Sequence, residues 1–104
     1  KCMQGNSALH SILKAAMMNP IYLNQASQTP DRAERIKFFI IATIASFIHT
    51  STFIKPLNPI LGETQTATTP DGTVFYSEQT CHHPPVSHLL IYGPNNCYRM
   101  VGYY

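Results

Sequence analysis

Two adjacent histidines, His82 and His83, stand directly before a Pro-Pro step in the stretch EQTCHHPPVS, Glu78–Ser87. An imidazole ring can donate a hydrogen bond to an anion and can carry a positive charge near neutral pH. Two rings that face the same phosphate would both be favoured in the charged form. The pair is therefore a candidate anion-binding site.

The backbone decides whether both rings can serve one site. Side chains of neighbouring residues on an extended chain point to opposite sides, so the chain must kink if both imidazoles are to face one ligand. Pro84 and Pro85 cannot donate hydrogen bonds to a sheet. We therefore predict that the strand before them stops or bulges near Thr80.

Other chemistries compete for the same residues. Cys81, His82, His83 or His88 could ligate a metal ion, although three adjacent ligands on an extended chain converge on one ion with difficulty. Cys81 could act as a nucleophile if the fold held a histidine base beside it, which adjacency in sequence does not show. A purely structural interpretation is that the histidines pack against the prolines. The residue pattern leaves these alternatives open.

A second polar motif, KPLNPILGE, spans Lys55–Glu63. Its two prolines restrict the backbone, and Lys55 and Asn58 each precede a proline, which favours an extended conformation. Lys55, Asn58 and Glu63 supply a cation, an amide and a carboxylate. The alternative to a binding role is an ordinary rigid loop with an exposed lysine, an Asx turn at Asn58 and a turn at Gly62.

The first half of the chain has the pattern of helices. Ser7 is a candidate cap for a first helix, and Asn19-Pro20 is expected to end it, since the residue before proline avoids the helical region. The spacing of Asp31 and Glu34 is typical of a helix start, and it predicts a helix over 32–49. The apolar residues of this helix, 38–48, predict that it is covered on most sides. They are fewer than the roughly 20 that a membrane-spanning helix needs.

The second half has the alternation of strands. Runs at 64–69, 73–79, 86–92 and 97–104 are rich in residues that favour β-structure, and tight turns at 70–72 and 93–96 separate them. Short strands joined by tight turns predict an antiparallel meander. With helices over about 7–50 and strands over about 60–104, the expected fold class is α+β. The outer strands of such a meander would be open, so the chain is expected to self-associate through its strand edges.

Composition limits the class of protein. The chain has 104 residues, 44% hydrophobic and 12% charged, which is typical of one globular domain or part of one. The net charge of +2 is too small to indicate nucleic-acid binding. Cys2, Cys81 and Cys97 are irregularly spaced, as expected for reduced thiols in the cytoplasm. The chain begins with lysine and ends in a strand pattern, so we expect a domain truncated at both ends.

The two motifs together resemble those of the oxysterol-binding-protein-related family of lipid-transfer proteins. The family's fingerprint is Glu-Gln-x-x-His-His-Pro-Pro, and EQTCHHPP matches it; KPLNPILGE resembles the family's upstream lysine-proline loop. Cys81 stands where a small hydroxyl residue is common. The resemblance implies that residues 1–104 are part of the family's ligand-binding domain, an incomplete antiparallel β-barrel around a hydrophobic lipid tunnel.

The resemblance also implies a function without catalysis, cofactor or metal. The expected ligands are a sterol, phosphatidylinositol 4-phosphate or both, carried between membranes by a cytoplasmic protein that is peripheral to membranes. His82 and His83 would contact the 4-phosphate, Lys55 and Asn58 the inositol phosphate region, and Glu63 would lie near the same entrance. An alternative is a phosphoinositide sensor or adaptor at membrane contacts that transfers no lipid.

Overall fold

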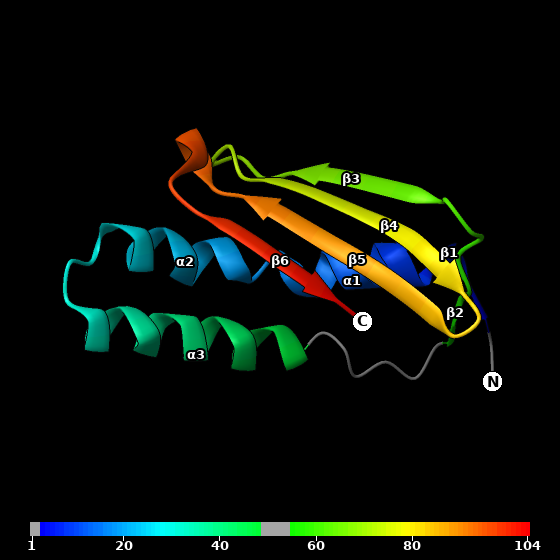
Figure 1. Cartoon of the computed structure of the whole chain (residues 1–104), viewed down its shortest axis with the longest axis horizontal. Helices are drawn as coiled ribbons and strands as arrows, with labels where there is room; N and C mark the ends of the chain where they lie inside the picture. The colour runs from blue at the N-terminus through cyan, green and yellow to red at the C-terminus, as the bar shows by residue number, and fades with distance from the viewer. Residues whose placement is uncertain (1–2, 49–54) are drawn as a thin grey trace.

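The computed structural model describes residues 3–48 and 55–104. Three helices lie beside a four-stranded antiparallel sheet and precede it in the chain (Figure 1). The helices are α1 (Ala8–Ala16), α2 (Asn19–Gln28) and α3 (Arg32–Ile48). The sheet has the order β3-β4-β5-β6 and comprises β3 (Thr64–Thr68), β4 (Val74–His82), β5 (Pro85–Tyr92) and β6 (Arg99–Tyr103). The α+β prediction is confirmed.

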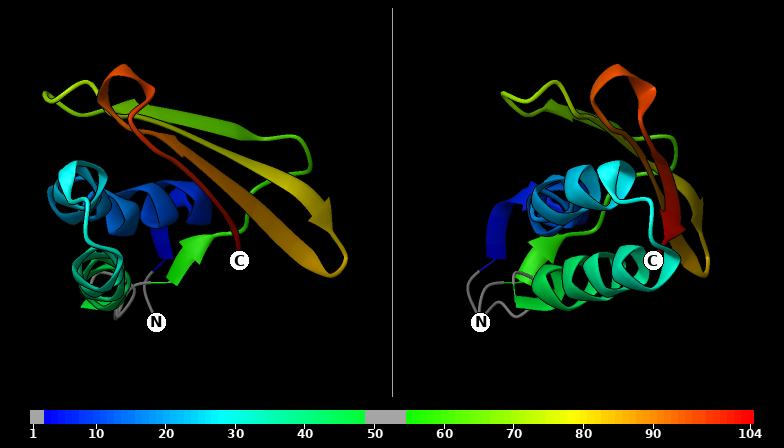
Figure 2. Two further views of the ribbon diagram at one scale, coloured as in Figure 1. Left: turned by 60° about the vertical axis from the view of Figure 1, so that its left-hand side comes forward. Right: turned by 90° about the vertical axis from the view of Figure 1, so that its left-hand side faces the viewer.

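The core lies between α1 and one face of the sheet. Phe75, Leu89 and Ile91 are fully buried on that face, and Leu13 and Ala16 of α1 pack against them. Their neighbours in the strands, such as Tyr76, are more exposed, which is the alternation expected of a sheet with one covered face. Figure 2 shows α1 under the sheet, with the other face of the sheet turned away from all three helices.

α2 begins at Asn19-Pro20, the step that was expected to end the first helix. The first helix has already ended at Ala16, and Pro20 lies in the first turn of α2. A proline is favourable there because the N–H that it lacks would have no partner within the helix. The buried Asn19 side chain also accepts a hydrogen bond from Ser46 of α3 at 3.1 Å. Ser7 is the N-cap of α1, but its hydroxyl makes no capping hydrogen bond.

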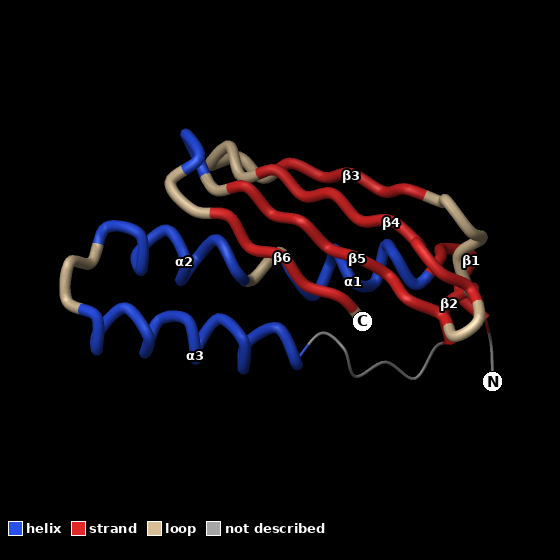
Figure 3. The backbone as a smooth tube through the Cα atoms, viewed as in Figure 1, coloured by secondary structure: helices blue, strands red, loops and turns tan. Residues whose placement is uncertain are grey.

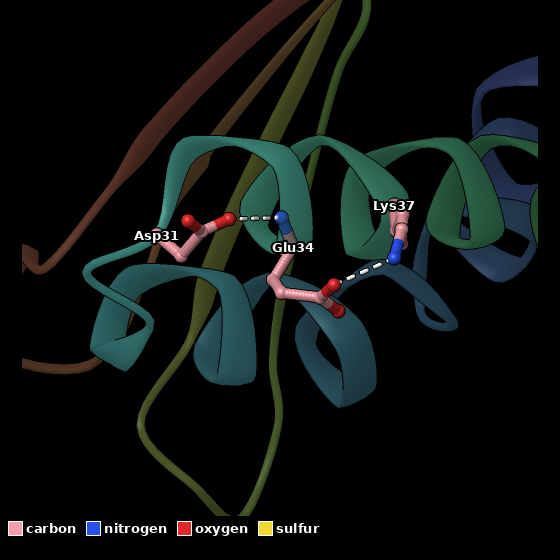
Figure 4. A network of polar contacts seen from close by, with 3 residues as sticks. All are labelled: Asp31, Glu34 and Lys37. Carbon is pink, nitrogen blue, oxygen red and sulfur yellow. Dashed lines mark hydrogen bonds and ion pairs between the residues drawn. The ribbon is translucent and has the colours of Figure 1, made fainter.

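The start of α3 is as predicted. The carboxylate of Asp31 accepts a hydrogen bond from the backbone N–H of Glu34 at 2.8 Å, and Glu34 forms an ion pair with Lys37 at 2.6 Å (Figure 4). The carboxylate satisfies one of the free N–H groups of the first turn. The helix ends at Ile48; the predicted His49 lies outside the described residues.

The prediction that α3 is covered on most sides is wrong for this chain. Only Ala42 and Ala45 of the helix are buried, because α3 packs chiefly on α2 through these small residues. Its larger apolar side chains are exposed: Ile36, Phe39, Ile40, Ile41, Ile44 and Ile48. Among the described residues, no helix combines the length and apolar character needed to cross a membrane.

Two short strands were missed by the sequence patterns. β1 (Met3–Ser7) and β2 (Lys55–Leu57) form a small parallel sheet of their own, visible beside the main sheet in Figure 3. Neither strand alternates clearly between polar and apolar residues, and β2 contains Pro56. A proline is tolerated there because an edge strand leaves one side of its backbone unpaired. This pairing brings Lys55 into a strand rather than a loop.

The turns of the meander are largely as predicted. Gly72 follows Pro70-Asp71 with φ +89°, the conformation that glycine adopts most readily. The second turn is a short 3-10 helix, η1 (Pro94–Asn96), in which Asn95 and Asn96 have positive φ. β6 therefore begins at Arg99, two residues later than the run at 97–104 suggested.

Candidate functional site

The histidine motif lies at the end of the β4–β5 hairpin. The register of the two strands shifts between Gln79 and Cys81, so a bulge falls at Thr80, as predicted. β4 nevertheless continues past the bulge to His82, which pairs with Pro85. The strand is therefore longer than the predicted run to Gln79. His83 and Pro84 form the turn, and Cys81 and His82 before it pair with Val86 and Pro85 after it.

The two imidazole rings lie close together at the end of the hairpin. The ring centroids of His82 and His83 lie 4.8 Å apart, with the ring planes at 72°. The Nδ1 atom of His82 is buried and has no hydrogen-bond partner among the described residues. His83 is exposed. The pair thus offers polar ring nitrogens that the surrounding chain does not satisfy.

Gln79 joins this hairpin to the second motif. Its backbone N–H donates to the carbonyl of Glu63 at 3.0 Å, and its carbonyl accepts from the N–H of Gly62 at 2.8 Å. The loop that ends the KPLNPILGE motif is therefore fixed by two backbone hydrogen bonds at a point three residues before the first histidine. Sequence reasoning recognised both motifs but did not foresee this link, since it pairs segments that are distant along the chain.

The side chain of Gln79 spans the bulge. It is 1% exposed, and its amide donates to the carbonyl of Cys81 at 2.9 Å. Its carbonyl oxygen accepts from the hydroxyl of buried Ser87 on β5. A buried polar group is retained at low cost only when it is hydrogen-bonded, and here both ends of the amide are. Gln79 therefore stabilises the bulge from the covered face of the sheet.

Glu63 shapes its own loop. Gly62 has φ +79°, and the turn is closed by a hydrogen bond from the N–H of Glu63 to the carbonyl of Ile60 at 3.0 Å. One carboxylate oxygen of Glu63 accepts from the N–H of Ile60 at 3.1 Å. The turn predicted at Gly62 is confirmed. The carboxylate of Glu63 is therefore hydrogen-bonded within its own loop.

Lys55 and Asn58 are exposed, Lys55 at the start of β2 and Asn58 just after it. Within residues 3–48 and 55–104, the structure gives no hydrogen bond, ion pair or ring contact between either residue and the two imidazoles. β2 and the β4–β5 hairpin end lie toward the same end of the long axis (Figure 1), and Figure 2 shows that they are not side by side. The structure thus brings His82 and His83 together and leaves Lys55 and Asn58 apart from them.

A separate polar cluster holds the far end of the sheet. Asp71, in the β3–β4 turn, accepts hydrogen bonds from Thr69, from the backbone and hydroxyl of Thr73, and from Asn24 of α2 at 2.6 Å. Partial burial raises the pKa of this carboxyl, but the hydrogen bonds outweigh it and lower the pKa from 3.8 to about 2. The cluster ties α2 to the sheet.

No group of three His, Cys, Asp or Glu side chains in the described part of the chain could hold a metal ion. Cys81 is half-buried at the bulge, and Cys97 is exposed at the other end of the sheet.

Comparison with known proteins identifies the family. The profile described as oxysterol-binding protein matches residues 3–101. The chain belongs to this family. It is 32% identical to oxysterol-binding protein 9 of Dictyostelium discoideum over 97% of its own length, and 46% identical to human oxysterol-binding protein-related protein 7 over 62%.

Solved structures agree with the family assignment. The chain is similar to the crystal structures of the Osh1 ORD domain in complex with cholesterol and with ergosterol, each with a TM-score of 0.78 and 32% identity over 88% of this chain. The chain spans 22% of those structures and 24% of the Dictyostelium relative. The shared fold confirms the helices followed by an antiparallel sheet.

Proposed function

We propose that the protein containing this chain binds a sterol and phosphatidylinositol 4-phosphate and moves them between membranes. Membership of the oxysterol-binding protein family and the similarity to sterol complexes of the Osh1 ORD domain support the lipid ligand. The observation that carries the phosphoinositide part is the pair of adjacent imidazoles, one with an unsatisfied buried nitrogen, on a hairpin hydrogen-bonded to the KPLNPILGE loop.

In this proposal the two motifs bind the lipid headgroup from two sides. A phosphate that leaves water needs charge-assisted hydrogen bonds, which charged imidazoles and a lysine ammonium supply. His82 and His83 contact the 4-phosphate, while Lys55 and Asn58 bind the inositol phosphate region across the space between β2 and the hairpin. Glu63 lies near the entrance and keeps the loop in shape through its bond to Ile60.

The acyl chains and the sterol need an apolar enclosure. We propose that the sheet is one part of an incomplete antiparallel β-barrel and that the exposed apolar side chains of α3 face its interior. Residues 1–104 are then one portion of the ligand-binding domain. Lipid exchange makes and breaks no covalent bond, so the proposed activity needs no nucleophile or cofactor, and the protein acts in the cytoplasm at membrane surfaces.

A vesicle assay on the intact protein tests this function. Donor vesicles carry fluorescent sterol or phosphatidylinositol 4-phosphate, acceptor vesicles carry neither, and movement of each lipid is followed with and without the other. We expect transfer of both lipids, with each competing against the other for the protein. Binding of the phosphoinositide without movement between vesicles would indicate a sensor or adaptor instead, and failure to bind either lipid would refute the proposal.

A further inference from the structure

The bulge before the histidine pair is also held from the face of the sheet that no helix covers. On β5, His88 is exposed between the buried residues Ser87 and Leu89, so it lies on the opposite face from them. The hydroxyl oxygen of Thr80, the bulge residue, is 2.7 Å from Nδ1 of His88 and 3.3 Å from the carbonyl oxygen of Val86. One side chain of β4 thus contacts two residues of β5 across the irregular part of the ladder.

The Thr80 hydroxyl can donate only one of its two contacts as a hydrogen bond. The hydroxyl of Thr80 has one proton to donate, and the carbonyl of Val86 can only accept. If the hydroxyl donates to that carbonyl, the 2.7 Å contact is a hydrogen bond only when Nδ1 of His88 carries a proton and donates it to the hydroxyl oxygen. Both contacts are hydrogen bonds at once only with a protonated Nδ1.

Neighbouring strands hold the His88 ring in place. His88 pairs with Glu78 in the register of β4 and with Tyr103 in the register of β6. The rings of His88 and Tyr103 have centroids 6.0 Å apart. The imidazole therefore has two partners on the open face of the sheet, the Tyr103 ring on β6 and the Thr80 hydroxyl on β4.

We propose that His88 and Thr80 form a clamp that sets the direction of His82 and His83. Gln79 spans the bulge on the covered face through Cys81, and the Thr80–His88 pair secures it on the other face. His88 is then a positioning residue that acts through the backbone and does not touch the lipid. The consequence for lipid binding rests on the phosphoinositide function proposed above.

Ring spectra of the intact protein test the clamp without any ligand. Nitrogen-15 labelling of the histidines reports which ring nitrogen carries the proton, and therefore whether His88 donates to the hydroxyl of Thr80 or accepts from it. Thr80→Val and His88→Ala should shift the ring signals of His82 and His83. Thr80→Ser, which keeps the hydroxyl, and His88→Asn, which places an amide near the position of Nδ1, should restore them. Thermal unfolding of each variant establishes that it is folded.

Binding to vesicles that contain phosphatidylinositol 4-phosphate gives the second readout. Loss of one hydrogen bond that orients the site should weaken binding about 3- to 10-fold in Thr80→Val and His88→Ala, with sterol binding unchanged and with recovery in the conservative variants. Unchanged His82 and His83 signals in the folded Thr80→Val and His88→Ala variants would overturn the clamp. If the unmutated protein does not bind vesicles that contain the phosphoinositide, the proposed function is wrong. The ring spectra still test the clamp in that case, because they need no ligand.

Discussion

At the residue scale, Gln79 is the residue on which the geometry of the site depends most. It carries four hydrogen bonds, two from its backbone to Gly62 and Glu63 and two from its side chain to Cys81 and Ser87. The fingerprint includes this glutamine, yet nothing in the sequence assigns it a role. An amide suits this position next to the bulge because its NH₂ group donates to the carbonyl of Cys81 while its oxygen accepts from the hydroxyl of Ser87.

We expect Gln79→Leu to destabilise the intact domain by about 1–3 kcal/mol, because it removes the side-chain partner of the Cys81 carbonyl and of the buried Ser87 hydroxyl. Urea unfolding followed by circular dichroism measures the change. Glu78→Gln is the matched control, since the neighbouring side chain is exposed on the other face. Equal stability of the two variants would mean that the side-chain bonds of Gln79 contribute little.

At the element scale, the sequence predicted structure well where the signal is local. The β3–β6 meander follows from Pro70-Asp71-Gly72 and from the alternation of the strands, and the start of α3 follows from Asp31. The β1–β2 pair and the link from Gln79 to Glu63 could not be predicted, because they join segments far apart in the chain and depend on backbone groups that every residue has. The prolines indicated the bulge at Thr80, whereas the arrangement of the His82 and His83 rings could not be predicted from the sequence.

The Asp71 cluster makes an element-scale prediction about pH. The pKa of Asp71 is about 2 in the folded protein and 3.8 as the ordinary value. A lowered pKa contributes stability that is present above about pH 4 and is lost as the pH falls through 2. Asp71→Asn should therefore be less stable than the unmutated domain at pH 5–7, and the difference should shrink between pH 4 and 2. Thermal unfolding across this range measures it, and a constant difference would contradict the assignment.

At the scale of the whole molecule, the main feature is the exposed apolar face of α3. Ile44 is 60% exposed and Ile48 71%, and contiguous exposed apolar surface marks a contact site. The chain spans 22% of the Osh1 ORD structures, and in our proposal this face lies toward the interior of the barrel in the intact domain. The same surface and the unpaired edges of β3 and β6 should make residues 1–104 alone self-associate.

Light scattering with size-exclusion chromatography tests this expectation on the isolated chain. We expect oligomers, and we expect Ile44→Glu to reduce them because it places a charge in the apolar face. Thr43→Glu is the control, since Thr43 is an exposed polar residue of the same helix. A monomeric chain, or an equal effect of both variants, would show that α3 is not the surface responsible.

The central claim is that the two motifs bind one phosphoinositide headgroup. The most direct measurement is extraction of phosphatidylinositol 4-phosphate and of sterol from vesicles by the intact protein, by Lys55→Ala and by His82→Ala/His83→Ala. Because a hydrogen bond to a charged group is worth about 1.5–3 kcal/mol, each variant should lose phosphoinositide affinity by about tenfold or more and keep sterol extraction. Unchanged phosphoinositide extraction in either folded variant, or an equal loss of both lipids, would contradict the account.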